Sequence, residues 1–538
     1  MRILVLQLAR LGDILQTLPA IQALKKTHPG SEITLVVRNR FADAARVSPH
    51  VDRIVELTTQ DILAPCIERG GAEGKRTALE RLSAWIGTAF DGTEFDLLVN
   101  LTFTEASAWL ASIIPARERR GAFHSKDGAF AIEDAWGQYF YAQVLQKNLN
   151  ILHLNDLFTR IAGVRADAAW PTEINPARVA AIPAGRKIGI QLTSSRPEKS
   201  PSIDAWAMIC AKLVARTGCD LVFFGAKQDL PAIRAVIGKA VISARSHVVA
   251  GSLRFHENAA WLKACERIVS PDTALVHFAS ICGVPVICIP MGGVRPEETG
   301  PYGAGHSVLY PANATPEEFS DEIARVAAGE TARNPIPHSR TRLTPCSDGT
   351  FRSELVPANF DADETANLFT HAYYLLAEFR CSGRVEELPM PKIGSPSQPE
   401  ALDRLVLAHD ALISIRKTAE FGCHHCLRML DYLDDPGTLK ALSSRVSEVD
   451  ALLDELRSSV ALVKPLLDEW RVKKTNVTGS TLEDLIGLTE GTYRELMQNV
   501  DIVLQLLQTA VKAAHEKVGA EKSMPLNVTK EPMKESTT

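Results

Sequence analysis

An aspartate on the first turn of a predicted helix is the first residue that could do chemistry in this chain. In the segment LQLARLGDILQTLPAIQALKK (residues 6–26), an apolar run typical of a strand ends near Gly12-Asp13, and a helical pattern follows. A carboxylate at this place can cap the unpaired N–H groups of the helix. If it faces a cleft, it can instead take a proton as a general base. The local pattern leaves both roles open.

A second predicted helix start has the features of a phosphate site. In SPDTALVHFASICGVPVICIP (270–290), a strand ends at Pro271 and a helix begins at Asp272-Thr273. Helix N-termini present unpaired N–H groups to anions, and Thr273 adds a hydroxyl. His277 follows four residues later, so it shares a helix face with Thr273. The alternative, slightly favoured by the local pattern alone, is that Asp272 is an N-cap and His277 a packed core histidine.

Two loops after predicted strands add further candidates. TSSRPEK (193–199) carries the hydroxyls of Ser194 and Ser195 and the cation of Lys199, which can neutralise a leaving diphosphate. A solvated surface loop explains this composition equally well. The Gly/Pro-rich loop GGVRPEETGPYG (292–303) either wraps a ligand or merely connects two elements.

The elements that must position these residues alternate between short apolar runs and helical patterns. The runs are continuous, as in parallel strands buried on both faces, and the alternation predicts an α/β fold. They lie at 2–8, 32–38, 52–57, 96–101, 187–192, 220–225, 267–271 and 284–290. Because the pattern restarts at Lys187 after a loop-rich stretch, we expect two Rossmann-like domains facing a cleft.

Several protein classes are excluded or disfavoured. The chain has no G-x-G-x-x-G, P-loop, G-x-S-x-G or H-E-x-x-H motif. A net charge of −5 argues against a general nucleic-acid binder. No long apolar window predicts a transmembrane helix, and Arg10 and Asp13 interrupt the first apolar run, unlike in a signal peptide. We expect a cytoplasmic protein.

Three motifs together resemble glycosyltransferase family 9, the ADP-heptose:lipopolysaccharide heptosyltransferases. They are RILVLQLARLGDILQTLPA at the start, SSRPEK with Trp206, and SPDTALVHFAS with CGVPVI followed by TGPYG. The resemblance covers residues 1 to about 345. It implies the GT-B fold and transfer of a sugar from a nucleoside diphosphate donor to an acceptor hydroxyl, with inversion and without a metal or other cofactor in catalysis.

The resemblance also implies roles for single residues. Asp13 matches the catalytic base, which is favoured over a mere cap. Ser194, Ser195 and Lys199 match contacts to the donor phosphates. Asp272, Thr273 and His277 match contacts to the donor's phosphate and sugar. Asp229 matches an acid that binds the nucleoside ribose.

The acceptor is less well indicated because the chain departs from the family there. The loop NLTFTEASAWL (100–110) has Glu105 where a basic residue is usual, and Ser200-Pro201 replaces a common Trp-Pro. A glutamate would repel a highly anionic lipid acceptor. A lipopolysaccharide core or related surface glycan, reached by peripheral membrane contact, is the main expectation. A protein acceptor such as flagellin or an autotransporter is the alternative. A non-catalytic nucleotide-sugar-binding scaffold is disfavoured. Such a protein has no need of a catalytic base such as Asp13 in addition to the phosphate-binding residues Lys199, Asp272 and His277.

The last third of the chain has a different pattern. Residues 389–400 read as a linker, and a helical region follows. Val446, Val449, Leu453, Leu456, Val460, Val463 and Leu467 form a coiled-coil seam. Pro465 is expected to end its helix, and STLE (480–483) predicts a capping box for the next. An intramolecular bundle is favoured over an oligomer interface, and the bundle could also dock a protein acceptor.

Four cysteines form a candidate structural metal site. Cys423 and Cys426 make a C-x-x-C pair, and Cys346 and Cys381 lie upstream. Four thiolates can hold Zn or Fe, and certain autotransporter heptosyltransferases of the family carry a four-cysteine iron site. Half-buried helical cysteines are the favoured alternative.

The predicted domains follow from these patterns. They are an acceptor domain at 1–175, a donor domain at 186–345, a connecting segment at 346–400, a helical bundle at 401–516 and a disordered tail at 517–538.

Overall fold

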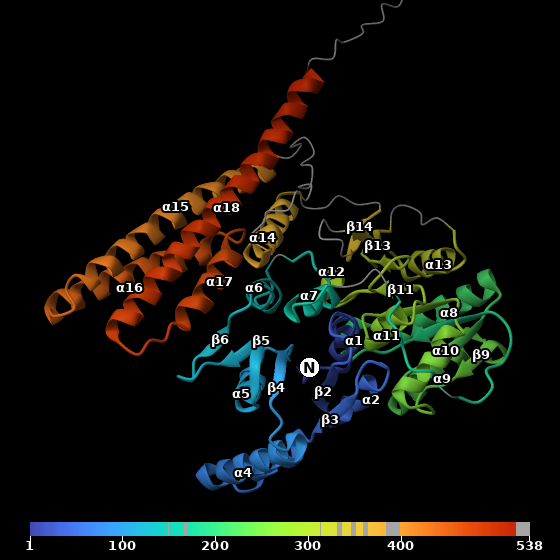
Figure 1. Ribbon diagram of the computed structural model, residues 1–538. Coiled ribbons are helices and arrows are strands. Elements are labelled where there is room, and N and C mark those ends of the chain that lie inside the picture. The colour runs from blue at the N-terminus through green and yellow to red at the C-terminus, as the bar shows by residue number, and fades with distance from the viewer. Residues whose placement is uncertain are drawn as a thin grey trace, which may run out of the picture.

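Two largely parallel β-sheets and a group of long helices make up the protein (Figure 1). The computed structural model describes residues 1–148, 150–165, 171–177, 179–312, 314–330, 336–345, 351–358, 364–382 and 399–522. The predicted linker and most of the predicted tail lie outside these ranges. None of the helices within them is long and apolar enough to cross a membrane.

The first sheet has the strand order β3-β2-β1-β4-β5-β6. Its strands are β1 Arg2–Leu6, β2 Glu32–Arg38, β3 Arg53–Leu57, β4 Phe95–Asn100, β5 Ala116–His124 and β6 Phe130–Ile132. All pairs are parallel except β5 with β6, which form an antiparallel pair. The side chains of β1 and β2 are almost all buried, as their continuous apolar runs predict.

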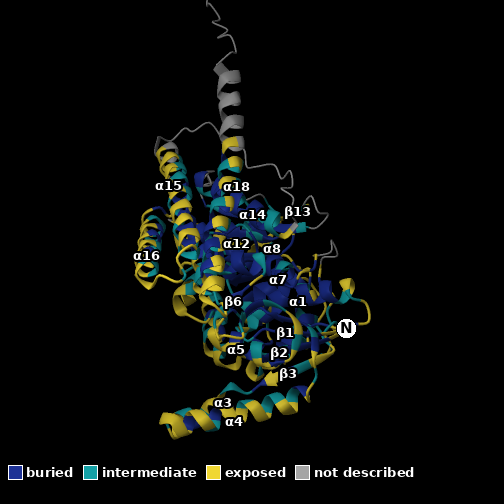
Figure 2. Cartoon of the chain, turned by 60° about the vertical axis from the view of Figure 1, so that its left-hand side comes forward, coloured by how far each residue is buried: buried dark blue, intermediate teal, exposed yellow. Residues whose placement is uncertain are grey.

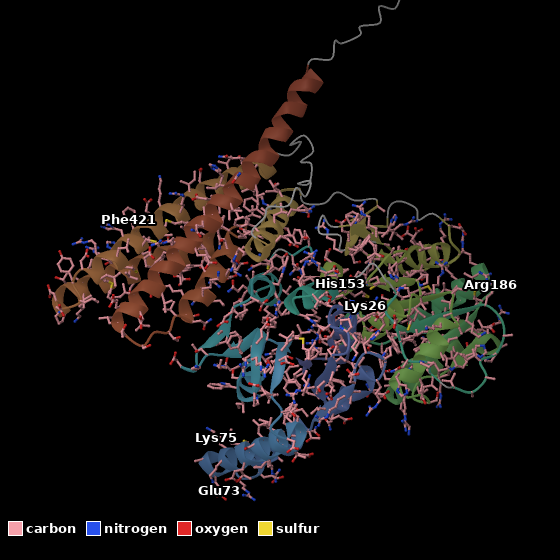
Figure 3. The ribbon with its side chains drawn as sticks, viewed as in Figure 1. Lys26, Glu73, Lys75, His153, Arg186 and Phe421 are labelled. Carbon is pink, nitrogen blue, oxygen red and sulfur yellow. The ribbon has the colours of Figure 1, made fainter. Side chains whose placement is uncertain are left out.

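Seven α-helices belong to this first lobe. They are α1 Leu11–Thr27, α2 Ala42–Ala45, α3 Thr59–Glu68, α4 Gly71–Phe90, α5 Glu105–Ile113, α6 Ala135–Tyr139 and α7 Leu154–Ile161. Figure 2 shows that α3 and α4 extend from the body of the lobe and are largely exposed. Figure 3 labels Glu73 and Lys75 at the outer end of α4.

The second sheet has the order β14-β13-β12-β11-β10-β7-β8-β9. Its strands are β7 Lys187–Gln191, β8 Asp220–Phe224, β9 Ser246–Val248, β10 Arg267–Pro271, β11 Val286–Ile289, β12 Ser307–Leu309, β13 His338–Pro345 and β14 Phe351–Pro357. The helices of this second lobe are α8 Ile203–Thr217, α9 Leu230–Ala240, α10 Asn258–Lys263, α11 Ala274–Ile281, α12 Pro296–Thr299 and α13 Pro316–Ala327.

The second sheet differs from the sequence prediction at both edges. The three-residue strand β9 was not predicted. The antiparallel pair β13–β14 continues the sheet beyond the predicted domain end at residue 345, because β13 pairs with β12 and β14 with β13. The two sheets nevertheless confirm the predicted α/β fold of two Rossmann-like domains.

The two lobes meet through buried polar contacts as well as through α1 packed on α11. Asp156 on α7 accepts hydrogen bonds from the Tyr302 hydroxyl at 2.6 Å and from the Ser353 N–H at 3.1 Å. His153 Nε2 lies 2.9 Å from the Gly300 carbonyl oxygen. Figure 3 labels His153 in this central region. These contacts join residues that lie 146 to 197 positions apart in the sequence, so they link the two lobes directly.

The C-terminal helices are α14 Glu364–Ser382, α15 Pro399–Leu430, α16 Pro436–Ser459, α17 Lys464–Thr475 and α18 Leu482–Lys522. The helix break predicted near Pro465 is present, but α16 already ends at Ser459, and Pro465 lies in the first turn of α17 rather than at the end of α16. Thr481, rather than Ser480, caps α18, because its hydroxyl accepts the Asp484 N–H. Helix α18 extends past the predicted bundle end at 516.

The bundle packs on the first lobe through charged as well as apolar side chains. Asp468 on α17 is buried and accepts hydrogen bonds from Asn148 Nδ2 at 2.7 Å and Lys464 Nζ at 2.9 Å. Glu469 is also buried and pairs with Arg380 of α14 at 3.0 Å. The predicted seam is therefore buried, wholly or in part, inside the chain.

Substitution of Gly422 on α15 tests the packing of α15 against α18. An added Cβ would lie 2.7 Å from the ring of Tyr493, which is fully buried and whose hydroxyl contacts Lys474 at 2.5 Å. We expect Gly422→Ala to lower the free energy of unfolding by about 1–3 kcal/mol through overpacking. Urea unfolding followed by circular dichroism measures the change.

Gly487 on α18 is the matched control. It is exposed, and an added Cβ would meet no atom within 4 Å. Gly487→Ala is expected to be neutral or to stabilise the helix by up to about 1 kcal/mol. Equal effects of the two substitutions would contradict the packing argument.

Candidate functional site

A cavity of about 700 Å³ lies between the two lobes and collects the residues that the sequence analysis singled out. The first turn of α1 contributes one side, and the loops after β7 and β8 and the start of α11 contribute the other. All eight predicted site residues line it: Asp13, Ser194, Ser195, Lys199, Asp229, Asp272, Thr273 and His277.

Asp13 both caps α1 and borders this cavity. Its carboxylate accepts the Arg10 N–H at 2.8 Å. Burial raises the pKa of Asp13 above its usual value, and the Arg10 N–H and the charges of Arg10 and Arg38 oppose that rise. A carboxylate with a raised pKa is a better proton acceptor than an ordinary one, provided that it stays ionised. The cap and the base are therefore compatible roles.

Asp272 and Lys199 bring opposite charges to the same cavity. Burial raises the pKa of Asp272 to about 6, while Lys199 lowers it and the charge of Asp13 raises it further. The two carboxylates, one from each lobe, thus influence each other across the cavity. Asp272 Oδ1 is buried and has no hydrogen-bond partner within the described ranges. This oxygen is available to a hydroxyl of a ligand.

His277 is packed against the opposite lobe. A Cβ added at Gly12 would lie 3.0 Å from His277 Cδ2 and 3.3 Å from Nε2. Burial lowers the pKa of His277 to about 3, so the imidazole is neutral. Its Nδ1 is buried and makes no hydrogen bond to any described residue. The ring is therefore a packed histidine that also lines the cavity, and it offers hydrogen bonding rather than charge.

The start of α11 provides the geometry of an anion site. Thr273 immediately precedes the helix, with its Oγ1 3.0 Å from Ser270 Oγ. The first N–H groups of α11 and the Lys199 ammonium border the same space. Ser194 is less available, because its hydroxyl donates to the Arg196 carbonyl at 2.7 Å. A helix N-terminus beside a lysine favours a phosphate group.

Asp229 closes a tight turn at the far end of the cavity. Its carboxylate accepts the Ala226 N–H at 2.7 Å and lies beside Gly225, where an added Cβ would be 2.8 Å from Oδ2. Gly225 has a φ of 148°, which also favours glycine. The turn holds the carboxylate at the carboxyl end of β8.

Sequence reasoning missed several other residues of the cavity wall. Examples are Arg10, Phe41 and Phe255 in the segments after β1, β2 and β9, Gln191 and Phe224 at the ends of β7 and β8, and Asn258 at the start of α10. The rule that ligands bind at the carboxyl ends of parallel strands would have pointed to Phe41. The loop with Phe255 was missed because β9 was not predicted.

Glu105, the departure noted in the sequence, is not among the residues that line this cavity. Its carboxylate lies 3.0 Å from Nε2 of the buried His124, and the Trp109 ring stacks on His124 with centroids 3.8 Å apart. These residues follow β4 and end β5, so they belong to the carboxyl edge of the first sheet.

The cysteines do not gather in the described part of the chain. Cys423 and Cys426 are buried on α15, with Cys423 Sγ 3.7 Å from the Glu490 carbonyl oxygen. Cys381 is exposed near the end of α14. Cys346 lies outside the described residues. Among those described, no three His, Cys, Asp or Glu side chains form a metal-binding group. The four-cysteine site stays a prediction.

Comparisons with known proteins agree with the resemblance. Residues 86–322 match the family model described as glycosyltransferase family 9 (heptosyltransferase). No curated protein matches the chain. A family 9 glycosyltransferase structure from Veillonella parvula is 20% identical, with 61% of this chain and 98% of that chain covered and a TM-score of 0.47. The structure of E. coli heptosyltransferase WaaC with ADP is 17% identical, with 61% of this chain and 98% of that chain covered and a TM-score of 0.45. The structure of E. coli ADP-heptose lipopolysaccharide heptosyltransferase II is 15% identical, with 61% of this chain and 99% of that chain covered and a TM-score of 0.44.

The raised pKa of Asp272 gives a stability prediction. At pH 8 the buried carboxylate is charged in the folded chain, so Asp272→Asn is expected to raise the melting temperature. The folded-state pKa of about 6 exceeds the ordinary value of 3.8, so the wild-type carboxylate costs stability as the pH rises through this range. The advantage of the variant is expected to shrink as the pH falls from about 8 to 4. Thermal unfolding across this range measures it, and an advantage that grows toward low pH would contradict the assignment.

Proposed function

Since the matched region identifies the chain as a glycosyltransferase, we propose that it transfers heptose from ADP-heptose to a lipopolysaccharide core or related surface glycan. The transfer inverts the anomeric centre and needs no metal. One observation carries the proposal: Asp13 from one lobe shares a cavity with Lys199, Asp272 and the start of α11 from the other. This arrangement supports a base on one side of the cavity and a phosphate-binding group on the other.

The chemistry follows from these two sides. Asp13 takes the proton of the acceptor hydroxyl as its oxygen forms a bond to the anomeric carbon of the donor. The bond from that carbon to the diphosphate oxygen breaks, and the electron pair leaves with the nucleoside diphosphate. Lys199 and the first N–H groups of α11 stabilise the negative charge on that leaving group. Burial of the cavity strengthens each of these interactions.

The donor's other parts have matching side chains. Asp229 at the end of β8 is placed to accept hydrogen bonds from ribose hydroxyls, and Asp272 Oδ1 from hydroxyls of the sugar. Phe41 and Phe255 offer apolar faces to a nucleobase. Heptose is supported by the sequence resemblance and by the description of the matching family, and adenine by the resemblance.

A protein acceptor is the second candidate, and the edge of the first sheet favours it. The carboxylate of Glu105 and the partly exposed Trp109 ring occupy a place where a polyanionic lipid would need cations. An acceptor with fewer negative charges, such as a serine or threonine hydroxyl of a protein or a neutral glycan, fits this edge better.

Asp13→Asn tests the base. The substitution keeps the shape of the side chain but removes its basicity, so turnover is expected to fall by at least about 10²-fold while nucleotide affinity stays within a few-fold. Steady-state transfer assays and calorimetric titration with ADP measure the two quantities.

Asp204→Asn is the matched control for that experiment. Asp204 lies in the first turn of α8, is exposed and pairs with Lys239, outside the cavity. Its substitution is expected to leave turnover unchanged. Turnover by Asp13→Asn close to that of the wild type would remove Asp13 from the role of base.

A thermal-shift panel of ADP, UDP and GDP and their sugars tests the donor. A ligand at 100 times its dissociation constant adds about 2.7 kcal/mol of stability. We expect this shift for ADP species, and we expect Lys199→Ala to reduce it while Lys263→Ala, at an exposed lysine of α10, does not. A shift with UDP or GDP instead would exclude ADP-heptose but keep the chemistry. No shift with any nucleotide would contradict the proposed donor site and the nucleotide-sugar-binding scaffold alike.

A further inference from the structure

A second cavity, of about 730 Å³, lies behind the catalytic cleft. The β13–β14 hairpin, the first half of α14 and the residues around Asn150 and α12 enclose it. Among the described residues, none lines both this cavity and the one between the lobes. Its volume falls within the range of about 300–1,000 Å³ that is typical of small-molecule sites. We call it the rear cavity.

Positive charge exceeds negative charge in the wall of the rear cavity. The guanidinium groups of Arg295, Arg342 and Arg352 face the carboxylates of Glu297 and Glu354 there. Glu354 pairs with both Arg342 and Arg352, and Glu297 is exposed at the rim. Arg295 pairs with Glu298 at 2.8 Å, so the two arginines of the hairpin, Arg342 and Arg352, share the single carboxylate of Glu354.

Arg352 is the group best placed to bind a ligand. It is only 8% exposed, and its guanidinium lies over the Tyr374 ring, 5.4 Å from the centroid. Its Nη2 pairs with Glu354, whereas its Nη1 is buried and donates to no described residue. A buried N–H without a partner is costly, and an anionic oxygen would remove that cost.

The rest of the wall suits a ligand with a larger body than a bare anion. His371 donates its Nδ1–H to the Asn367 carbonyl at 2.8 Å, which leaves Nε2 of the neutral ring as an acceptor for a hydroxyl. Ile151, Leu355 and Leu375 add apolar surface. The wall therefore combines an anion donor, a hydroxyl acceptor and apolar contacts.

We propose that the rear cavity binds a small organic anion, a phosphate or carboxylate carried on a hydroxylated body, with Arg352 as its principal anchor. This second site stands independently of the reaction proposed for the cleft. Helix α12 separates the two: Glu297 lines the rear cavity, and Thr299 lines the cleft. An occupant of the rear cavity thus contacts the same short helix that borders the donor side of the cleft.

The test is calorimetric titration of the full chain with glucose 6-phosphate and citrate, and with neutral glucose as the comparison. Saturable binding of at least one of the two anions is expected, and none of glucose. Arg352→Met is expected to weaken that binding at least tenfold. Asn367→Trp, which keeps every arginine and fills the cavity, is expected to abolish it, and it decides the question if Arg352→Met does not fold.

Two further variants separate this site from other anion binding. Arg340→Met removes an exposed arginine of the same hairpin outside the cavity and is expected to change nothing. Lys199→Ala removes the cation of the cleft and is also expected to leave the binding intact. The proposal fails if neither anion binds saturably to the wild type, if Asn367→Trp binds as tightly, or if Lys199→Ala alone abolishes binding.

Discussion

Contact between α1 and α11 brings the two lobes close enough to share a site. Gly12 has no side chain, so the first turn of α1 approaches the His277 ring to a distance at which a Cβ would already be crowded. This approach buries Asp13 and Asp272 in one cavity and raises the pKa of both. The same burial keeps His277 neutral. The electrostatic character of the site is therefore a consequence of one close helix–helix packing.

The negative charges of Asp13 and Asp272 in one cavity oppose the close approach of the two lobes. Polar contacts elsewhere in the interface support that approach. Asp156 is fully buried and accepts two hydrogen bonds from the second lobe. On another side of the interface, Asp43 of α2 accepts the His256 N–H at 3.1 Å and lies 2.8 Å from His256 Nδ1. Buried hydrogen-bonded groups such as Asp156 are costly to separate, because separation leaves each of them unpaired. The lobes are thus joined on several sides of the cavity that they enclose.

The sequence predicted those parts of the fold that depend on local pattern. Continuous apolar runs identified the central strands, and the residues at their carboxyl ends identified the cavity, because parallel strands open at one edge. The strand β9 has only three residues, and β13 and β14 carry polar side chains at many positions. None of these three strands therefore has the continuous apolar run that identifies a buried strand. The contacts of Asp156 and His153 across the interface could not be predicted from the sequence, because their partners lie far away in the chain. Thr481 replaced Ser480 as a cap because a shift of one residue leaves the local signal unchanged.

The helical bundle is joined to the lobe that the proposed reaction assigns to the acceptor. After β14 the chain leaves the second sheet, and α14 packs on α6 of the first lobe. Helix α17 follows it there, with Asp468 bonded to Asn148. The Glu105–His124 pair belongs to the same lobe, whereas the Ser200-Pro201 departure lies in the second lobe, between β7 and α8. The donor side, in contrast, keeps the matched motifs around Lys199 and Asp272. This arrangement supports our proposal that acceptor recognition depends on the first lobe and on the bundle beside it.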